Sequence, residues 1–287
     1  MLSKLQLLFT TSRPISWVNT AYPFAAGYLV CGGAVDARLI VGTLFFLIPY
    51  NLLMYGINDV FDYESDILNP RKGGVEGAVT AKKYHPLIVW SSVLLSLPFV
   101  ALLIAMTPAV SWIVLAALLF FVVAYSAKGL RFKEVPFLDS ITSSIHFVGP
   151  LVYALSILGF PAVAWPAVIA FFLWGMASHA FGAVQDIVPD REAGIGSIAT
   201  VMGARVTVWF SVLCYSAAAI LVSLYGLFGL IIGISGLFYV WNVLGFTGLT
   251  DKLSGRARAG WKRFLWLNYS TGAVVTICLL MLYLWAK

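Results

Sequence analysis

The sequence predicts an all-α, polytopic membrane protein, and its composition and the grouping of its apolar residues lead to that fold class. Hydrophobic residues make up 61% of the 287 residues and charged residues only 10%, with a mean hydropathy of +0.93. Soluble domains are about 45–50% apolar, so this chain is expected to lie in a lipid bilayer, without a nucleic-acid partner. No linker or low-complexity segment interrupts the pattern, which predicts one domain over residues 1–287.

The apolar residues fall into runs of roughly 20, the length that one spanning helix requires. A short segment around Leu5–Phe9 precedes them and is expected to form an interfacial helix. Nine spans are predicted, at about residues 15–33, 39–57, 86–106, 109–127, 139–158, 162–182, 205–224, 226–247 and 264–285.

The charged residues are divided unevenly between the two sides that these spans define. Of the 18 Lys and Arg residues, all but Arg38 and Lys287 fall on the side of the N-terminus, as do all the acids except Asp36. The positive-inside rule therefore places the N-terminus in the cytoplasm and the C-terminus outside. We expect a multi-pass protein of the plasma membrane whose chemistry is carried out on its cytoplasmic side.

The first candidate site lies at the end of the second predicted span. Asn58, Asp62 and Asp66 recur every four residues there, with Asp59 beside them. On a continuous helix this spacing would place the three side chains on one stripe. Acids that crowd together near a bilayer without an interspersed base are candidates for binding a cation, and magnesium prefers such oxygen ligands.

A second acidic pair follows the sixth predicted span. Asp186 and Asp190 are again four residues apart, although Pro189 is expected to weaken a helix there. Two carboxylate clusters at two helix ends predict a pair of Mg²⁺ ions that hold a diphosphate. The alternative is that these acids are solvated loop residues.

Basic and polar residues near these motifs are candidates for diphosphate binding. Arg71 and Lys72 follow the first motif, and Tyr125, Lys128 and Arg131 follow the fourth predicted span. Lysine and arginine bind phosphate oxygens well. Some of these residues, however, can equally serve as topology charges.

Two polar residues lie about two helical turns deeper than the acids. Asn51 precedes Asn58 by seven residues, and His179 precedes Asp186 by the same interval. Seven residues return to nearly the same helix face, about 10 Å along the axis. Asn51 is therefore predicted to line a pocket, and His179 to be a candidate proton acceptor there. A purely structural role is the alternative for each.

These motifs resemble those of the UbiA-type intramembrane prenyltransferases, a family with nine transmembrane helices. The family's NxxxDxxxD motif is matched by Asn58, Asp62 and Asp66, and its DxxxD motif by Asp186 and Asp190, followed by Arg191. The Tyr125–Ser126 pair also matches. The phrases SRPISWVNTAYPF and FFLWGMASHAFGAVQDIVPDREAG are similar to the lycopene elongases of actinobacterial C50 carotenoid pathways.

The resemblance implies a magnesium-dependent enzyme that transfers a dimethylallyl group from dimethylallyl diphosphate to the ends of lycopene. In that reading the metal ligands are Asn58, Asp59, Asp62, Asp66, Asp186 and Asp190. Lys128, Arg131 and Arg191 would bind the leaving diphosphate. The alternatives are a prenyltransferase that acts on an aromatic or quinone precursor with a longer donor, and a cation-coupled transporter.

Overall fold

The structure is a computed structural model that describes residues 3–68 and 80–285. The side chain of Asp66 lies outside this description, as do Arg71 and Lys72, so the predictions for these three side chains fall outside the described structure. Within the described residues the chain forms helices and connecting loops, with no strand. The predicted all-α class is therefore confirmed.

Eight of the predicted spans correspond to helical segments that are long and apolar enough to cross a membrane, counted over the described residues. They are Ala37–Phe61, Lys82–Met106, Ala109–Ser126, Leu138–Ile157, Ala162–Val184, Ile198–Ser223, Gly226–Leu244 and Asp251–Trp285. The chain is thus a multi-pass membrane protein.

The predicted count of nine is not confirmed, because the first predicted span differs from the other eight. The structure has there a helix of 13 residues, α2 (Val18–Val30), preceded by a short 3-10 turn, η1 (Pro14–Ser16), and by α1 (Lys4–Thr11). At 1.5 Å per residue, α2 by itself is about 20 Å long, shorter than the hydrocarbon core of a bilayer.

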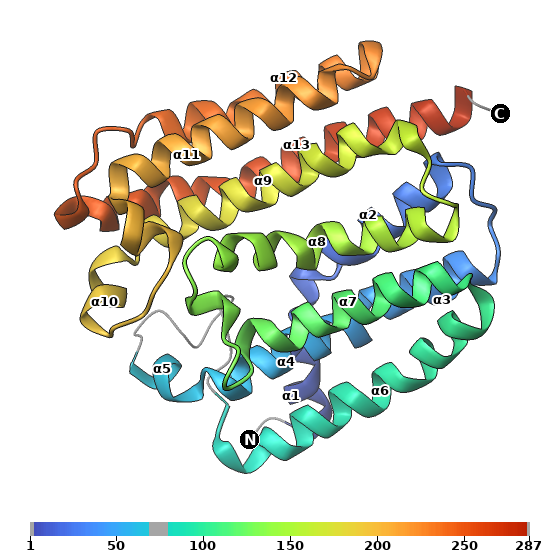
Figure 1. The fold of residues 1–287 in the computed structure, drawn as a ribbon, viewed down its shortest axis with the longest axis horizontal. Coiled ribbons are helices and arrows are strands. Elements are labelled where there is room, and N and C mark those ends of the chain that lie inside the picture. The colour runs from blue at the N-terminus through green and yellow to red at the C-terminus, as the bar shows by residue number, and fades with distance from the viewer. Residues whose placement is uncertain (1–2, 69–79, 286–287) are drawn as a thin grey trace. The chain divides into compact units, whose positions relative to one another are not determined.

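The contacts divide the chain into two compact units, 1–131 with 149–160, and 132–148 with 161–287. Besides α1 and α2, the helices of the first unit are α3 (Ala37–Leu47), α4 (Pro49–Phe61), α5 (Tyr63–Leu68), α6 (His85–Met106), α7 (Ala109–Ser126) and the second half of α8 (Leu138–Ile157). In this unit α4 packs on both α6 and α7, and α2 packs on α3 (Figure 1).

The second predicted span is broken in its middle, where Ile48 and Pro49 separate α3 from α4. The break leaves backbone carbonyls near the end of α3 that need other donors. The buried side-chain amide of Asn51 donates to the carbonyl oxygens of Phe46 (2.8 Å) and Leu47 (3.1 Å) and to Oγ1 of Thr20 (2.7 Å). Asn51, predicted to line a pocket, thus uses its donor group to stabilise this break.

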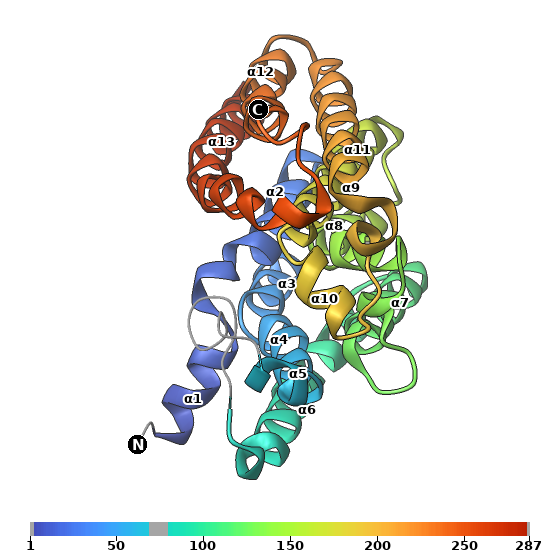
Figure 2. The same ribbon diagram turned by 90° about the vertical axis from the view of Figure 1, so that its left-hand side faces the viewer.

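In the second unit, α9 (Trp165–Val184) packs along α11 (Ile198–Ser223), α11 along α12 (Gly226–Leu244), and α12 along α13 (Arg258–Trp285). Figure 2 views these helices close to end-on. Its core is built from buried apolar side chains such as Phe181, Val208 and Tyr239. Besides the first half of α8, its helices are α9 (Trp165–Val184), α10 (Ile187–Glu192), α11 (Ile198–Ser223), α12 (Gly226–Leu244) and α13 (Arg258–Trp285), with the 3-10 segment η5 (Asp251–Ala257) before α13.

Candidate active site

Both acidic motifs lie in the same kind of local structure. In the first unit, α4 ends at Phe61, and the six-residue helix α5 begins directly after Asp62. In the second unit, α9 ends at Val184, and the six-residue helix α10 follows Asp186. Each motif therefore occupies the junction between a long apolar helix and a short polar one, as the similar spacing of the two sequence motifs indicates.

For the first motif, the sequence predicted one continuous helix with its polar side chains on one stripe. The junction shows that this prediction was wrong, because α4 ends at Phe61 and α5 begins at Tyr63. Asp62 still donates its backbone N–H to the carbonyl of Asn58 at 2.9 Å, but its φ of −94° and ψ of −1° end α4. Short polar side chains that bond to one another or to the backbone compete with helix continuation. Asn58 and Asp62 thus share a helix face, whereas Asp66 belongs to a separate helix.

Asn58 is the centre of a polar cluster at the end of α4. Its Nδ2 donates to Oδ2 of Asp62 at 2.8 Å and to Oγ of Ser126, at the end of α7, at 2.9 Å. Asp62 and Ser126 are both almost fully buried. The hydrogen bonds therefore join the first motif directly to the Tyr125–Ser126 pair that the sequence singled out.

Arg131 reaches the same cluster from the loop after α7. The loop turns at Gly129 (φ +94°), and Arg131 itself has a φ of +44°. Its Nη2 lies 3.8 Å from Oδ1 of Asp62, and its Nη1 donates to the carbonyl of Phe61 at 3.5 Å. Tyr125 is half-buried and Lys128 exposed, so of these three residues Arg131 is the one whose contact with the first motif is observed.

Asp59 has a different position from the other acids of its motif. Its carboxylate is buried, and Nη2 of Arg13 lies 2.6 Å from its Oδ1. The Arg13 guanidinium also lies over the Tyr55 ring, 4.1 Å from the centroid. Asp59 is one residue, about 100°, round the helix from Asn58. We therefore do not include Asp59, which the sequence grouped with the metal ligands, in the proposed metal site.

The second motif keeps the spacing expected from the sequence. The backbone N–H of Asp190 donates to the carbonyl of Asp186 at 2.9 Å, and both side chains are half-buried. Pro189 does not break α10, because it stands in the first turn, where its missing N–H has no helical acceptor in any case. The helix is interrupted earlier, around Gln185 and Asp186.

Arg191 is held by protein groups. Its Nε and Nη2 donate to the carbonyl of Thr200 at 3.0 and 2.6 Å, and its Nη1 to Oδ2 of Asp251 at 2.7 Å. Asp251 also accepts the backbone N–H of Ala204 at 2.7 Å, just after Gly203, whose φ of +75° kinks α11. Arg191, predicted to bind the diphosphate, thus fastens α10 to α11 and η5.

His179 has a partner that no local spacing revealed. Its Nε2 lies 3.4 Å from Oδ2 of Asp139, in the first turn of α8, 40 residues earlier in the chain. Asp139 is not among the candidate residues that the sequence singled out. Arg13 and Asp251 were missed for the same reason, because their partners are distant in sequence.

The donor chemistry of the first cluster fits magnesium. Asn58 and Asp62 offer the hard oxygen ligands that Mg²⁺ prefers, and the guanidinium of Arg131 lies beside Asp62. Among the described residues no three His, Cys, Asp or Glu side chains gather as a closed metal site. Magnesium is commonly held by one or two carboxylates, water and substrate phosphates, so these residues suffice for it.

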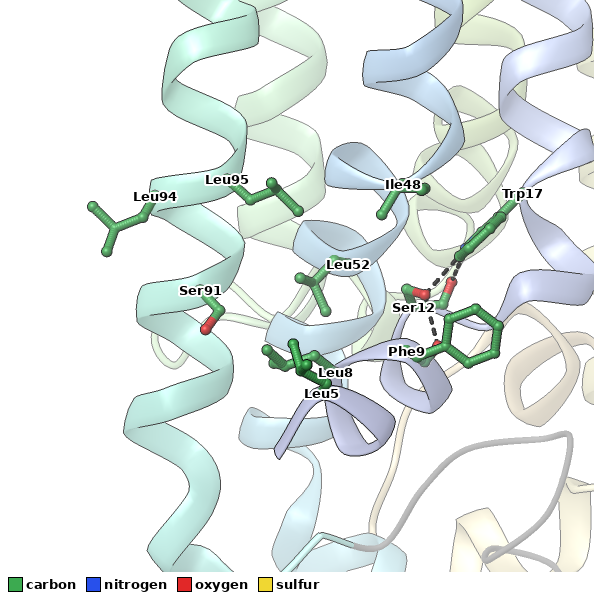
Figure 3. Close-up of a pocket in the computed structure, with 10 residues that line it drawn as sticks. All are labelled: Leu5, Leu8, Phe9, Ser12, Trp17, Ile48, Leu52, Ser91, Leu94 and Leu95. Atoms are coloured by element: carbon green, nitrogen blue, oxygen red, sulfur yellow. Dashed lines mark hydrogen bonds between the residues drawn. The ribbon is translucent and has the colours of Figure 1, made fainter. Parts of the chain in front are cut away.

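A separate apolar pocket lies between α1, α4 and α6 of the first unit (Figure 3). It has a volume of about 550 Å³ and is lined mainly by leucines, together with Phe9, Ser12 and Trp17. Trp17 Nε1 donates to the carbonyl of Ser12 at 3.0 Å and to its Oγ at 3.1 Å, which fixes the turn before α2. None of the candidate site residues that the structure describes lines this pocket.

Comparison with known proteins agrees with this architecture. Residues 20–271 match the model of the UbiA prenyltransferase family. The chain is 50% identical to a lycopene elongase/hydratase of Corynebacterium glutamicum over 99% of both chains. It is also 50% identical to the C(50) beta-cyclic carotenoids biosynthesis protein LbtBC of Dietzia sp., over 95% of this chain and 64% of that protein.

Solved structures share the fold at low sequence identity. A UbiA homologue from Aeropyrum pernix K1, in its apo form, superposes with a TM-score of 0.67 at 19% identity, covering 91% of this chain and 97% of that one. One from Archaeoglobus fulgidus, bound to DMAPP and Mg²⁺, gives a TM-score of 0.66 at 18% identity, with 94% and 99% covered.

The helical fold defines a multi-pass membrane protein, and two acidic helix junctions distinguish it. The chain belongs to the UbiA prenyltransferase family, and it is a prenyltransferase.

Proposed function

We propose that this enzyme transfers a C5 dimethylallyl group from dimethylallyl diphosphate to the ends of lycopene. The observation that carries the proposal is the cluster in which Asn58 joins Asp62 to Ser126, with Arg131 beside the carboxylate. Oxygen ligands and a guanidinium in one cluster are what a magnesium-bound diphosphate requires. The 50% identity to a lycopene elongase/hydratase supports lycopene as the acceptor.

The ligands in this proposal are Asn58, Asp62 and Asp66 of the first motif and Asp186 and Asp190 of the second. Magnesium bound at either motif would offset the charge of the diphosphate as the allylic C–O bond breaks. Arg131 and the exposed Lys128 donate hydrogen bonds to the leaving phosphate oxygens, whose charge grows in the transition state. Both cations come from one short loop, which positions them together.

The transfer proceeds through carbon–carbon bond formation. The bonding electrons of the C–O bond leave with the diphosphate, and the terminal double bond of lycopene attacks the allylic carbon. A tertiary carbocation then remains on the former acceptor; capture of water with loss of one proton gives a tertiary alcohol, and loss of a proton from carbon gives an alkene. Apolar surroundings keep water away from the allylic cation until the new bond has formed.

The same proposal places the reaction on the cytoplasmic side of the plasma membrane. Lys128 and Arg131 share a loop with Lys133, and the positive-inside rule assigns so basic a loop to the cytoplasm. Dimethylallyl diphosphate is water-soluble and would reach the site from that side, whereas lycopene would enter from the bilayer.

Expression in a lycopene-accumulating bacterium tests the function directly. Mass spectrometry of the pigments should show carotenoids enlarged by one or two C5 units with the wild-type chain, and none with Asp62→Asn. Glu64→Gln is the matched control, because Glu64 belongs to the same stretch but is exposed and paired with Lys82 at 2.5 Å. We expect this variant to retain activity.

Unchanged lycopene beside a well-folded wild-type protein would overturn the acceptor assignment. In that case diphosphate release with a longer polyprenyl donor and an aromatic acceptor would identify the enzyme as a quinone-precursor prenyltransferase. Equal loss of activity in Glu64→Gln and Asp62→Asn would contradict a specific role for the cluster around Asn58.

A further inference from the structure

Asp139 joins three helices of the second unit. Its side chain is fully buried in the first turn of α8, and its Oδ2 accepts the backbone N–H of Ile198, at the start of α11, at 2.9 Å. The same oxygen lies 3.4 Å from Nε2 of His179 on α9. Within the described residues, the other carboxylate oxygen, Oδ1, is buried and accepts no hydrogen bond.

A buried carboxylate with so few donors is costly unless a positive or polar partner faces it. The imidazole of His179 is that partner. Since Nε2 faces the carboxylate oxygen at 3.4 Å, the carboxylate favours the neutral tautomer that carries hydrogen on Nε2, which leaves the lone pair of Nδ1 to accept a proton. A base that is oriented by a buried carboxylate is a recurring arrangement in acid–base catalysis.

The two members of the pair differ in their access to solvent or substrate. The side chain of His179 is 22% exposed, whereas that of Asp139 is 0% exposed. His179 lies on α9 five residues before the end of that helix at Val184, about 8 Å along the axis from the junction that holds the second motif. The fully buried Asp139 therefore supports the imidazole from within the protein, while the imidazole itself is partly accessible.

We infer that His179, oriented by Asp139, accepts the proton of the water molecule that captures the tertiary carbocation. This inference rests on the proposed function. A lone pair of the water oxygen forms the new C–O bond, one O–H bond breaks with its electrons remaining on oxygen, and the proton moves to Nδ1 of His179. His179 is then a catalytic residue, and Asp139 is a positioning residue that stabilises the resulting imidazolium.

The product composition tests this role, because a structural histidine would not change it. The purified enzyme in lipid vesicles receives Mg²⁺, dimethylallyl diphosphate and lycopene in ¹⁸O-labelled water. Diphosphate release gives the rate of transfer, and mass spectrometry gives the ratio of labelled alcohol to alkene. The variants are His179→Gln, Asp139→Asn and the double variant, with His85→Gln as a histidine control outside the pair.

We expect His179→Gln and Asp139→Asn to lower the alcohol-to-alkene ratio about 10-fold or more, since a positioned base contributes at least this much. Carbon–carbon bond formation should persist in both. The double variant should lower the ratio no further than His179→Gln, because both residues act in one unit. If Asp139→Asn fails to fold, His179→Gln, altered at a partly exposed side chain, still carries the test.

An unchanged alcohol-to-alkene ratio in His179→Gln would overturn the inference, whatever happens to the total rate. It would also be overturned if the wild-type enzyme adds C5 units but incorporates no ¹⁸O. A wild-type enzyme that transfers nothing to lycopene would instead refute the proposed function, a result that pigment analysis separates from the other two.

Discussion

Nη2 of Arg13 lies 2.6 Å from Oδ1 of Asp59, so an ion pair connects the turn before α2 to the first acidic motif. Arg13 adopts a φ of +49°, a conformation that costs a non-glycine residue about 1–2 kcal/mol. The hydrogen bonds from Trp17 to Ser12 stabilise the turn, and the Tyr55 ring covers the guanidinium. The pair thus fixes α4 from a second face, about 100° round the helix from Asn58 and its hydrogen bond with Ser126.

Asp59→Asn is expected to reduce stability rather than metal binding. The substitution leaves the guanidinium of Arg13, only 16% exposed, without its counter-charge, and breaking a buried pair costs about 3–5 kcal/mol. Thermal unfolding in detergent should show this loss, while the Mg²⁺ concentration for half-maximal activity stays near that of the wild type. A Mg²⁺ requirement raised as far as in Asp62→Asn would restore Asp59 to the metal ligands.

Activity should depend on a divalent metal and on Asp62 together. Chelation with EDTA is expected to abolish diphosphate release, and added Mg²⁺ to restore it. Asp62→Asn should lower kcat by about 10²–10³-fold, the effect of removing one group that stabilises transition-state charge. Isothermal titration with Mg²⁺ and a diphosphate analogue should show weaker binding for this variant than for Glu64→Gln. Full activity of the wild type in EDTA would exclude the metal-dependent reaction.

Arg191 and Asp251 are expected to act as one structural unit. Each is about half exposed, and the two are joined by a 2.7 Å ion pair. Arg191→Gln and Asp251→Asn should therefore each lower the melting temperature, and the double variant should lower it by less than the sum of the two, because the ion pair that they share is lost only once. The KM for dimethylallyl diphosphate distinguishes this structural role from direct binding of the diphosphate by Arg191. An increase in KM confined to Arg191→Gln would mean that the guanidinium also contacts the phosphate.

Gly203 should not tolerate a side chain. Its φ is +75°, and a Cβ at this position would lie 3.0 Å from Oδ1 of Asp251. Gly203→Ala is expected to cost about 1–3 kcal/mol of stability through backbone strain. Gly272→Ala is the matched control, because nothing lies within 4 Å of its Cβ position in α13. This control should be neutral or stabilising by up to about 1 kcal/mol. Equal melting temperatures for the two variants would refute the strain argument.

The sequence by itself determined the helical membrane class, most helix positions and the location of both acidic motifs. These properties are local: a bilayer requires every backbone group to bond within its own helix, so apolar runs become helices whatever their neighbours are. The spacing of Asp186 and Asp190 was likewise preserved, because a helical turn links residues four apart.

The tertiary structure decided which polar groups are partners. Arg13 with Asp59, Asp139 with His179 and Arg191 with Asp251 are separated by 40 to 60 residues, so no periodicity relates them. Through these contacts Asp59 and Arg191 form ion pairs, whereas the sequence predicted that Asp59 binds metal and Arg191 binds phosphate. The same packing brings the carboxylate of Asp139 next to His179. A buried charge takes its role from the nearest group of opposite charge, and packing alone determines which group that is.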